Sequence, residues 1–221
     1  MADSAQGAPG STPGASCGPD VAVSRTAERV ELRREEILDA SERIFAQKGY
    51  HSTGIADIAT ALGIGHGTFY RYFKNKHDIA LNVFDRVMTR FAEVGLSEDP
   101  SASDSLEAYR EQSRRILMGW LELGASHPHV LRFFHEQSMV IDGERLARMI
   151  DLYNTHMARF LQNGVDKGFL RASLDVPSTA EMLIALIMEG TRRTLAMPDA
   201  DARRRWAEAG LALMFDGIRA R

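Results

Sequence analysis

The sequence predicts an all-α fold, and three observations support that prediction. Apolar residues recur at spacings of three and four along most of the chain, as at Ile55, Ile58, Ala59 and Leu62, which is the period of a helix. Glycines and prolines lie between these segments, and no alternation of apolar and polar residues indicates a strand. Hydrophobic residues make up 44% of the chain, which is enough to fill a buried core.

The composition limits the class of protein. A single cysteine, Cys17, excludes an intramolecular disulfide framework and a cysteine-based zinc site, and it suits a reducing compartment. The longest strongly apolar run, residues 182–188, is too short to cross a bilayer, and the N-terminus shows no secretory signal. We therefore expect a soluble, cytoplasmic protein with no membrane partner.

Three parts are expected along the chain. Residues 1–24 are rich in Gly, Ala, Ser and Pro and bury too little apolar area to offset the entropy of ordering, so they should form a disordered tail. The net charge of the whole chain is −3, but residues 25–77 carry nine Lys and Arg against seven Asp and Glu. Residues 78–221 carry 18 Lys and Arg against 21 Asp and Glu. The chain therefore divides into a slightly basic N-terminal domain and a larger, acidic helical domain.

The first domain should begin with two helices. Apolar residues from Ile37 to Phe45 follow one face of a helix over about residues 30–48. The second helix is short and carries the apolar residues named above. Thr53 is placed to cap its N-terminus, and Gly63 follows its last apolar residue, where a left-handed C-terminal cap belongs.

The next stretch, LGIGHGTFYRYFKNK at residues 62–76, alternates glycines and then brings lysines. A nucleotide-binding loop is one interpretation, because glycine-rich turns followed by lysine often cradle phosphate. Such a loop requires a preceding strand or a Gly-Lys-Ser/Thr sequence, and neither is present. A helix-turn-helix fits better: the turn begins at Gly63, and a helix over about residues 65–73 directs Phe69 and Phe73 inward.

The exposed face of that helix suits a DNA groove. It carries hydrogen-bond donors, aromatic edges and little bulk at its N-terminal end, at His66, Gly67, Thr68, Tyr70, Arg71 and Tyr72. Lys74 and Lys76 follow, and no acid occurs from Gly63 to His77, so the positive potential is local. A further helix begins after Asn75, which can cap it together with Asp78. Its free N–H groups near Lys76 suit a phosphate.

At this point the chain resembles the TetR/AcrR family of bacterial transcriptional regulators. The resemblance covers about residues 34–84 and rests on GTFYRYFKNK preceded by DIA-A-LG, whereas residues 85–221 are similar only in length and helical character. It implies an all-helical homodimer in which three N-terminal helices bind double-stranded operator DNA. It also implies that a small-molecule effector in the larger domain releases the DNA. Release on effector binding favours a repressor, and an activator is the alternative, because the position of the operator decides between the two.

The resemblance also implies roles for particular residues. Tyr70 and Lys76 match family positions that touch phosphate, and so does Thr53, while His66, Gly67, Thr68 and Tyr72 match the recognition helix. The sequence departs from the family pattern where many relatives have a capping Ser and it has Gly65. The alternative for Tyr70 is a partly buried helix aromatic, and for Lys76, Arg71, Lys74 and His66 a solvated surface residue.

The second domain should hold five further helices after the one that starts near Lys76, at about residues 103–124, 128–139, 143–168, 177–195 and 200–219. The segment AEMLIALIMEG is apolar nearly all round and should be buried on most sides. The resemblance implies that the last two helices of each subunit form a four-helix dimer interface, and the alternative is a monomer in which they are core.

An effector pocket is expected among the middle helices. Methionine and aromatic residues line adaptable apolar sites, which suggests Trp120, Tyr153, Met157 and Met188, although such residues are more often plain core. Asn154 and Glu189 are candidate polar anchors.

Sequence motifs for catalysis are lacking. The chain has no HExxH or GxSxG, and the spacing of His127, His129 and His135 does not place them on one helical face. We therefore expect no enzyme activity, no metal and no cofactor. The alternative function is a helical small-molecule-binding protein or enzyme with a vestigial helix-turn-helix.

Overall fold

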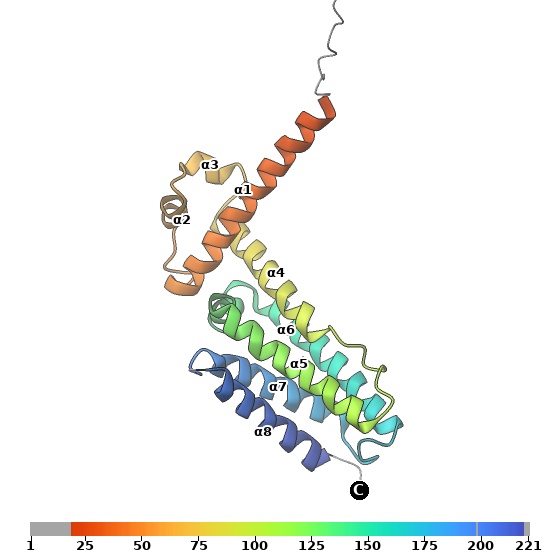
Figure 1. The fold of residues 1–221 in the computed structure, drawn as a ribbon. Helices are drawn as coiled ribbons and strands as arrows, with labels where there is room; N and C mark the ends of the chain where they lie inside the picture. The colour runs from red at the N-terminus through yellow and green to blue at the C-terminus, as the bar shows by residue number, and fades with distance from the viewer. Residues whose placement is uncertain (1–18, 198, 219–221) are drawn as a thin grey trace, which may run out of the picture. The chain divides into compact units, whose positions relative to one another are not determined.

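The computed structural model describes residues 19–197 and 199–218, and eight helices account for nearly all of them (Figure 1). In chain order they are α1 (Pro19–Lys48), α2 (Ile55–Leu62), α3 (His66–Tyr70), α4 (Lys76–Gly95), α5 (Leu106–Ser126), α6 (Pro128–Asp166), α7 (Val176–Thr194) and α8 (Ala200–Ile218). The all-α prediction is confirmed. In this described part of the chain, no helix combines the length and the apolar character needed to cross a bilayer.

Helix α1 begins eleven residues earlier than the expected start at residue 30. Residues 19–24 were assigned to a disordered tail and are helical, while residues 1–18 of that tail lie outside the described residues. Nearly all side chains from Ala27 to Glu36 are exposed, and ion pairs such as Arg33–Glu36 at 2.7 Å link successive turns. A helix without a buried face has no apolar period, which is why the sequence pattern did not reveal it.

Residues up to Glu36 and residues from Ile37 onward pack as separate units. In the second unit, Ile37 and Phe45 of α1 are fully buried, and the Phe45 ring lies 6.4 Å from that of Phe133 on α6. The apolar stripe of α4 is buried as well, at Phe84, Val87, Met88 and Phe91. Helix α5 packs against α6, α7 and α8 (Figure 1).

A buried carboxylate joins three of these helices. Glu42 on α1 has a side chain that is 1% exposed, and its oxygens lie 2.8 Å from Arg90, 3.7 Å from Arg86 and 3.0 Å from His129. Arg86 and Arg90 belong to α4, and His129 belongs to the first turn of α6. Burial lowers the pKa of His129, and the nearby Glu42 carboxylate partly opposes that change. This ion cluster fixes the C-terminal half of α1 to the larger helical domain.

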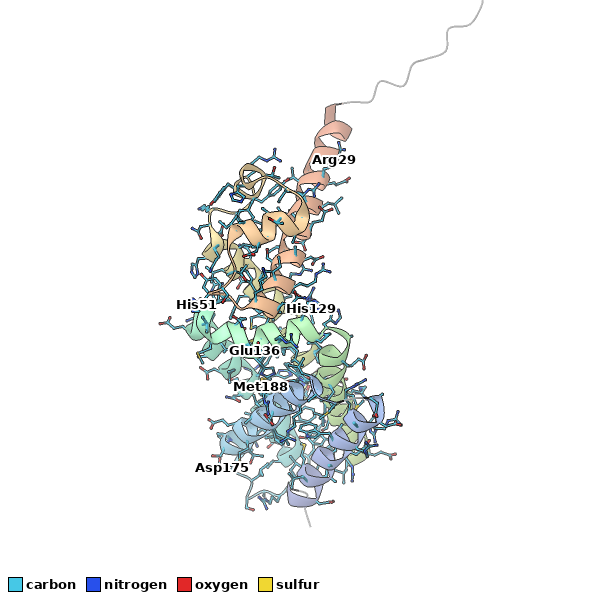
Figure 2. The ribbon with its side chains drawn as sticks, turned by 90° about the vertical axis from the view of Figure 1, so that its left-hand side faces the viewer. Arg29, His51, His129, Glu136, Asp175 and Met188 are labelled. Carbon is cyan, nitrogen blue, oxygen red and sulfur yellow. The ribbon has the colours of Figure 1, made fainter. Side chains whose placement is uncertain are left out.

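The helices of the second domain begin and end close to the predicted positions. The two helices expected over residues 128–139 and 143–168 are continuous as α6 except at Asp142, whose φ of −156° and ψ of 86° are not helical. Asp175 caps α7 by accepting from the N–H of Ser178, with Pro177 in the first turn (Asp175 is labelled in Figure 2). In the single chain α7 is buried along one face, at Ala180, Ile184 and Ile187, and Met182 is 70% exposed. Burial of a second face against a partner subunit stays a prediction.

The Glu42 cluster allows a direct test of stability. We predict that Glu42→Ala lowers the free energy of unfolding by about 3 kcal/mol, because it leaves two arginines without their buried partner. Chemical denaturation would measure the change. Glu144→Ala removes an exposed carboxylate that lies 3.7 Å from Arg148, and it should change stability by less than about 0.5 kcal/mol. Equal losses in the two variants would contradict a structural role for Glu42.

Candidate nucleic-acid interface and internal cavity

Helix α2 is capped differently from the prediction. Gly54, not Thr53, is the N-cap residue, and its N–H donates to Asp57 Oδ2 at 2.7 Å. Lys48 Nζ lies 2.7 Å from the other Asp57 oxygen, and these two hydrogen bonds lower the pKa of Asp57. The Thr53 hydroxyl donates instead to Gly49 O at 2.8 Å, and the residue is 2% exposed. The structure therefore gives no support to a phosphate contact by the Thr53 side chain.

The turn after α2 has the predicted geometry. Gly63 has a φ of +62°, in the left-handed region that favours glycine, and its N–H donates to Thr60 O at 3.1 Å. The N–H of Ile64 then donates to Ala59 O at 3.0 Å. These bonds satisfy carbonyls at the end of α2 and reverse the chain into α3. Gly63 is thus the C-cap that the sequence predicted.

Helix α3 is shorter than the predicted helix over residues 65–73. It ends at Tyr70, and the N–H groups of Tyr72 and Phe73 both donate to Phe69 O, which continues the chain as a turn. Phe69 and Phe73 are buried, with ring centroids 5.8 Å apart, as expected. The two phenylalanines hold this short helix onto the core, so its other side is left facing outward.

The outward side of α3 and the turn after it carries most of the predicted DNA-binding residues. Tyr70 is 54% exposed, and its ring meets the edge of the buried Phe69 ring. The Arg71 guanidinium lies over the Tyr72 ring, 5.8 Å from its centroid. The exposed members are His66, Gly67, Tyr70, Arg71 and Lys74, and the half-buried ones are Thr68, Tyr72 and Lys76.

Gly65 and Gly67 are open to their surroundings. A Cβ atom added at either position would meet nothing within 4 Å. Internal packing therefore does not require glycine at these two sites. Because these two residues have no side chain, nothing projects beyond the backbone at the start of α3. The backbone there could therefore approach a DNA groove closely.

Lys76 lies at the start of α4 and belongs to a small cluster. The members of this cluster are Tyr50, His51, Lys76 and His77. Its Nζ donates to His51 O at 3.2 Å and lies 4.5 Å from the centroid of the Tyr50 ring. The Tyr50 hydroxyl is 3.5 Å from His77 Nδ1 (His51 is labelled in Figure 2). The sequence analysis missed Tyr50, His51 and His77 as neighbours of this site, because only the chain reversal after Gly49 brings Lys76 to residues about 25 positions away.

The start of α4 is capped largely as predicted. The N–H of Asp78 donates to Asn75 Oδ1 at 2.9 Å. The Asp78 carboxylate accepts in turn from the N–H of Lys74 at 2.7 Å, one residue before the expected donor, the N–H of Asn75. The chain between α3 and α4 is thereby held in one conformation, which fixes the position of Lys76.

An apolar cavity lies among α5, α6, α7 and α8. It has two lobes of about 50 and 20 Å³, and both are lined by Ile116, Met157, Phe160 and Ile187. Of the predicted effector residues, Trp120, Tyr153 and Met157 line this cavity. Met188, which is labelled in Figure 2, is not among the residues that line the cavity. The aliphatic lining residues were not singled out, because their spacing is that of any helix core.

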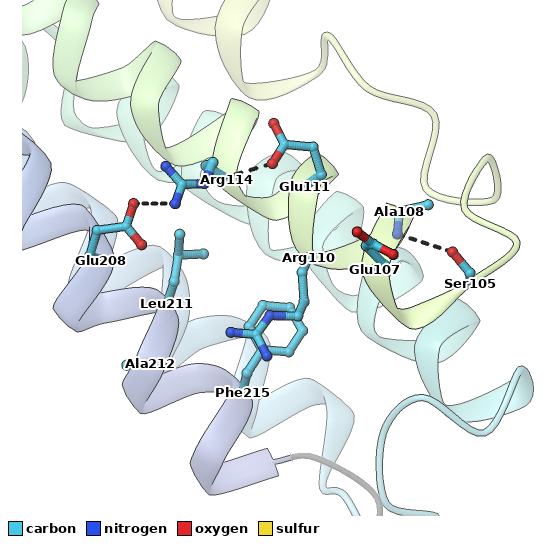
Figure 3. Close-up of a pocket in the computed structure, with 10 residues that line it drawn as sticks. All are labelled: Ser105, Glu107, Ala108, Arg110, Glu111, Arg114, Glu208, Leu211, Ala212 and Phe215. Atoms are coloured by element: carbon cyan, nitrogen blue, oxygen red, sulfur yellow. Dashed lines mark hydrogen bonds and ion pairs between the residues drawn. The ribbon is translucent and has the colours of Figure 1, made fainter.

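A second, polar groove lies between α5 and α8 (Figure 3). Its arginines already have partners: Arg114 pairs with Glu208 and lies 3.7 Å from Glu111, while the Arg110 guanidinium lies 4.9 Å from the centroid of the Phe215 ring. Because its cations are paired with its own carboxylates and ring, the groove offers little net attraction to a ligand of either charge.

His129 and His135 of α6 contact different partners and do not converge on one site. His135 Nε2 lies 3.1 Å from the Thr191 hydroxyl, and burial lowers the pKa of His135 to about 4. His129 contacts Glu42, as described above. The described residues hold no group of three or more His, Cys, Asp or Glu side chains that could bind a metal ion.

A helix-turn-helix with a cationic and aromatic outer face, followed by a helical domain that encloses an apolar cavity, defines a DNA-binding regulator with an effector domain. Residues 37–83 match the family model described as "Bacterial regulatory proteins, tetR family". The fatty acid metabolism regulator protein of Bacillus subtilis (strain 168) is 29% identical over 167 residues, which are 74% of this chain and 84% of the relative. Residues 37–83 therefore carry the DNA-binding segment of the TetR family of transcriptional regulators, and the chain is similar to regulators of this kind over most of its length.

Two solved structures share the fold. One is the fatty acid degradation regulator FadR from Bacillus halodurans, with a TM-score of 0.69 and 23% identity over 86% of this chain and 97% of that one. The other is the transcriptional regulator FadR from Bacillus subtilis in complex with stearoyl-CoA, with a TM-score of 0.66 and 24% identity over 84% of this chain and 99% of that one. These likenesses extend the fold comparison beyond the matched N-terminal segment to the cavity-bearing helices.

The open surface at Gly67 leads to a prediction. Gly67→Ala should raise the stability of the free protein by about 0.4–1 kcal/mol, because alanine favours the helix and meets no neighbour. The same variant should bind DNA at least about tenfold more weakly, a difference of about 1.4 kcal/mol. The added methyl group would project from the start of α3 and keep its backbone away from the groove. Thermal unfolding and fluorescence anisotropy would measure the two effects.

The matched control is Gly217→Ala, where the added Cβ also meets nothing within 4 Å. It should leave DNA affinity unchanged. A stable Gly67→Ala variant with wild-type affinity would show that close approach at this position is not needed.

Proposed function

We propose that this protein is a TetR-family repressor that binds operator DNA as a homodimer and releases it when a small, largely apolar effector enters the internal cavity. The observation that carries the proposal is the outer face of α3, where His66, Gly67, Tyr70 and Arg71 are exposed together beyond the turn at Gly63. Such a face suits the major groove, because it combines donors and aromatic edges with a low N-terminal end.

Two kinds of DNA contact follow from the geometry. His66, Gly67, Thr68 and Tyr72 lie on or next to α3 and would face base edges. Tyr70, Arg71, Lys74 and Lys76 would contact the phosphate backbone, with Lys76 in the first turn of α4, where the positive end of the helix dipole favours an anion. Thr53 is left out of this set because its side chain is buried and its hydroxyl is bonded to Gly49 O.

The homodimer would form through α7 and α8. Met182 on α7 is 70% exposed and Leu213 on α8 is 68% exposed, while Ala185, Ala209 and Ala212 on the same two helices are exposed as well. Small and apolar side chains suit the close packing of helices across a two-fold axis. Two such subunits would place their α3 helices in successive major grooves, about 34–36 Å apart.

The effector would be mainly apolar and would bind among α5 to α8. The lobes of the cavity are lined by aliphatic and aromatic side chains, with Trp120, Tyr153 and Met157 among them, and by no Lys, Arg, Asp or Glu. A relative whose structure contains stearoyl-CoA supports an apolar ligand class in this fold. Because operator DNA of a bacterium lies in the cytoplasm, we also place the protein there.

The alternative is a helical small-molecule-binding protein or enzyme whose helix-turn-helix is vestigial, and the cavity favours it. The residues that line the cavity include one histidine, His156, and no carboxylate, thiol or lysine that could act with it as a nucleophile. We therefore propose regulation rather than catalysis. A gel shift with the DNA upstream of its own gene distinguishes the regulator from the small-molecule-binding protein or enzyme. If no fragment shifted at low salt, the regulator would be rejected and the alternative function would stand.

Lys76 gives a test of the phosphate contact. Lys76→Ala should weaken binding to the upstream DNA and to random DNA alike, and it should reduce the slope of log affinity against log salt by about 0.9. Anisotropy titrations at several salt concentrations would measure both. Arg148→Ala removes the same charge from the exposed surface of α6 and should leave the slope unchanged. An unchanged slope in Lys76→Ala would rule out a phosphate contact.

The exposed leucine on α8 gives a test of the dimer. Leu213→Lys should shift the mass in solution from twice 24.5 kDa towards 24.5 kDa, because the buried face of a dimer would have to desolvate two ammonium groups. Light scattering would measure the mass. Leu152→Lys, the same change at a leucine that is 50% exposed on α6, should leave the dimer intact. A monomeric wild-type protein would refute the proposed interface.

A further inference from the structure

Two buried polar atoms stand out in the otherwise apolar cavity. The Tyr153 hydroxyl and His156 Nε2 are both enclosed and have no hydrogen-bond partner in the protein, and both residues line the same lobe of the cavity. A buried polar atom without a partner lowers stability, because it has given up its hydrogen bonds to water. Such atoms are retained where something else pairs with them.

The Tyr153 ring is held in place by its neighbours. It meets the Trp120 ring edge to face, at 90° and 5.5 Å between centroids. Gly95 on α4 allows this close packing, since a Cβ there would lie 2.6 Å from the Trp120 ring and 2.9 Å from the Tyr153 ring. Burial raises the pKa of the Tyr153 hydroxyl well above its usual value, so the group keeps its proton and can donate. The hydroxyl is therefore a fixed donor inside the cavity.

His156 offers the opposite capacity. Its ring makes a hydrogen bond to the Glu98 backbone, and because Nε2 has no partner this bond uses Nδ1. A ring that donates from Nδ1 to a carbonyl carries its lone pair on Nε2 when it is neutral. Burial lowers the pKa of His156, which favours the neutral ring; the hydrogen bond to the Glu98 backbone opposes this change in part. Nε2 is therefore an acceptor.

The spacing of the two residues would let both atoms bind one group of a ligand. Tyr153 and His156 are three residues apart on α6, and side chains at that spacing are neighbours on a helix surface. A donor and an acceptor that line the same lobe match a hydroxyl group, which accepts one hydrogen bond and donates one.

We propose that Tyr153 and His156 hold a hydroxyl group of a neutral, otherwise apolar effector, which accepts from the Tyr153 hydroxyl and donates to His156 Nε2. The proposal rests on the proposed function only in taking this cavity as the effector site. A carboxylate or phosphate in the same place would be buried without a counter-charge, because no Lys or Arg lines either lobe. The effector would thus differ in its polar group from the stearoyl-CoA found in the Bacillus subtilis relative.

The test uses three probes that share one ring system: naphthol, naphthalene and naphthoate. Isothermal titration calorimetry of the full-length protein would measure the affinity for each in the absence of DNA. We expect naphthol to bind at least about tenfold more tightly than naphthalene, the gain of roughly two hydrogen bonds to buried partners. Naphthoate should bind more weakly than naphthol because its charge is buried without compensation.

Variants then test whether Tyr153 and His156 cause the preference for naphthol over naphthalene. Tyr153→Phe and His156→Phe keep a ring at each position and remove one partner, so each should reduce the preference for naphthol over naphthalene by at least about threefold. Tyr109→Phe is the matched control. The Tyr109 hydroxyl is also buried, but it donates to Phe160 O at 3.1 Å and does not line the cavity, so the preference should stay as in the wild type.

Stability gives a second readout that needs no probe. Thermal unfolding should show Tyr109→Phe lowering the melting temperature, because a satisfied hydrogen bond is lost. Tyr153→Phe should leave it unchanged or raise it, because the deleted hydroxyl has no partner in the free protein.

Several outcomes would overturn the proposal. They are equal affinity of the wild type for naphthol and naphthalene, tighter binding of naphthoate, no binding of any probe, or an unchanged preference in both Tyr153→Phe and His156→Phe. The failure of the proposed function looks different, because DNA binding is measured separately. A wild type that selects naphthol but binds no DNA would keep the hydroxyl site and reject the repressor.

Discussion

The buried carboxylate of Glu42 is the interaction on which the arrangement of this protein depends. It lies among Arg86, Arg90 and His129, and so it ties the C-terminal half of α1 to α4 and to the start of α6. A charge taken out of water is tolerated only where partners surround it, so these helices have little freedom to separate without exposing or orphaning that charge. Tyr50 adds a second link, since its N–H donates to Gln137 of α6 at 2.7 Å.

The helix-turn-helix depends on this frame for its position, but its own shape is set locally. Gly63 adopts the left-handed conformation, the phenylalanines of α3 and the turn after it are buried, and Asn75 caps α4. With only five residues, α3 has too few internal hydrogen bonds to be stable alone and relies on Phe69 for its anchorage. The polar and aromatic residues on the other side are therefore presented by a rigid support, which favours recognition of a groove of fixed shape.

The cavity and the helix-turn-helix share helices. Gly95, at the end of α4, touches the cavity residues Trp120 and Tyr153, while the start of α4 carries Lys76. Helix α6 likewise carries His129 at one end and the cavity residues Tyr153 and Met157 further along. A ligand that moved Tyr153 would act on α4 directly through Gly95, and on the start of α6 across the break at Asp142, so contiguous packed segments connect the cavity to the helices that hold α1.

The sequence by itself determined the all-helical class, the turn at Gly63, the inward phenylalanines, the cap at Asn75 and the family of the DNA-binding segment, because each depends on residues close together in the chain. Three of the four predicted effector residues, Trp120, Tyr153 and Met157, also line the cavity, since large apolar side chains follow the helix period. The tertiary structure alone decided the rest. It buried Thr53, placed His51 beside Lys76, left Met182 exposed, and enclosed the Tyr153 hydroxyl and His156 Nε2 without hydrogen-bond partners. These facts depend on contacts between distant segments, and local spacing carries no information about which distant side chain fills or leaves a given space.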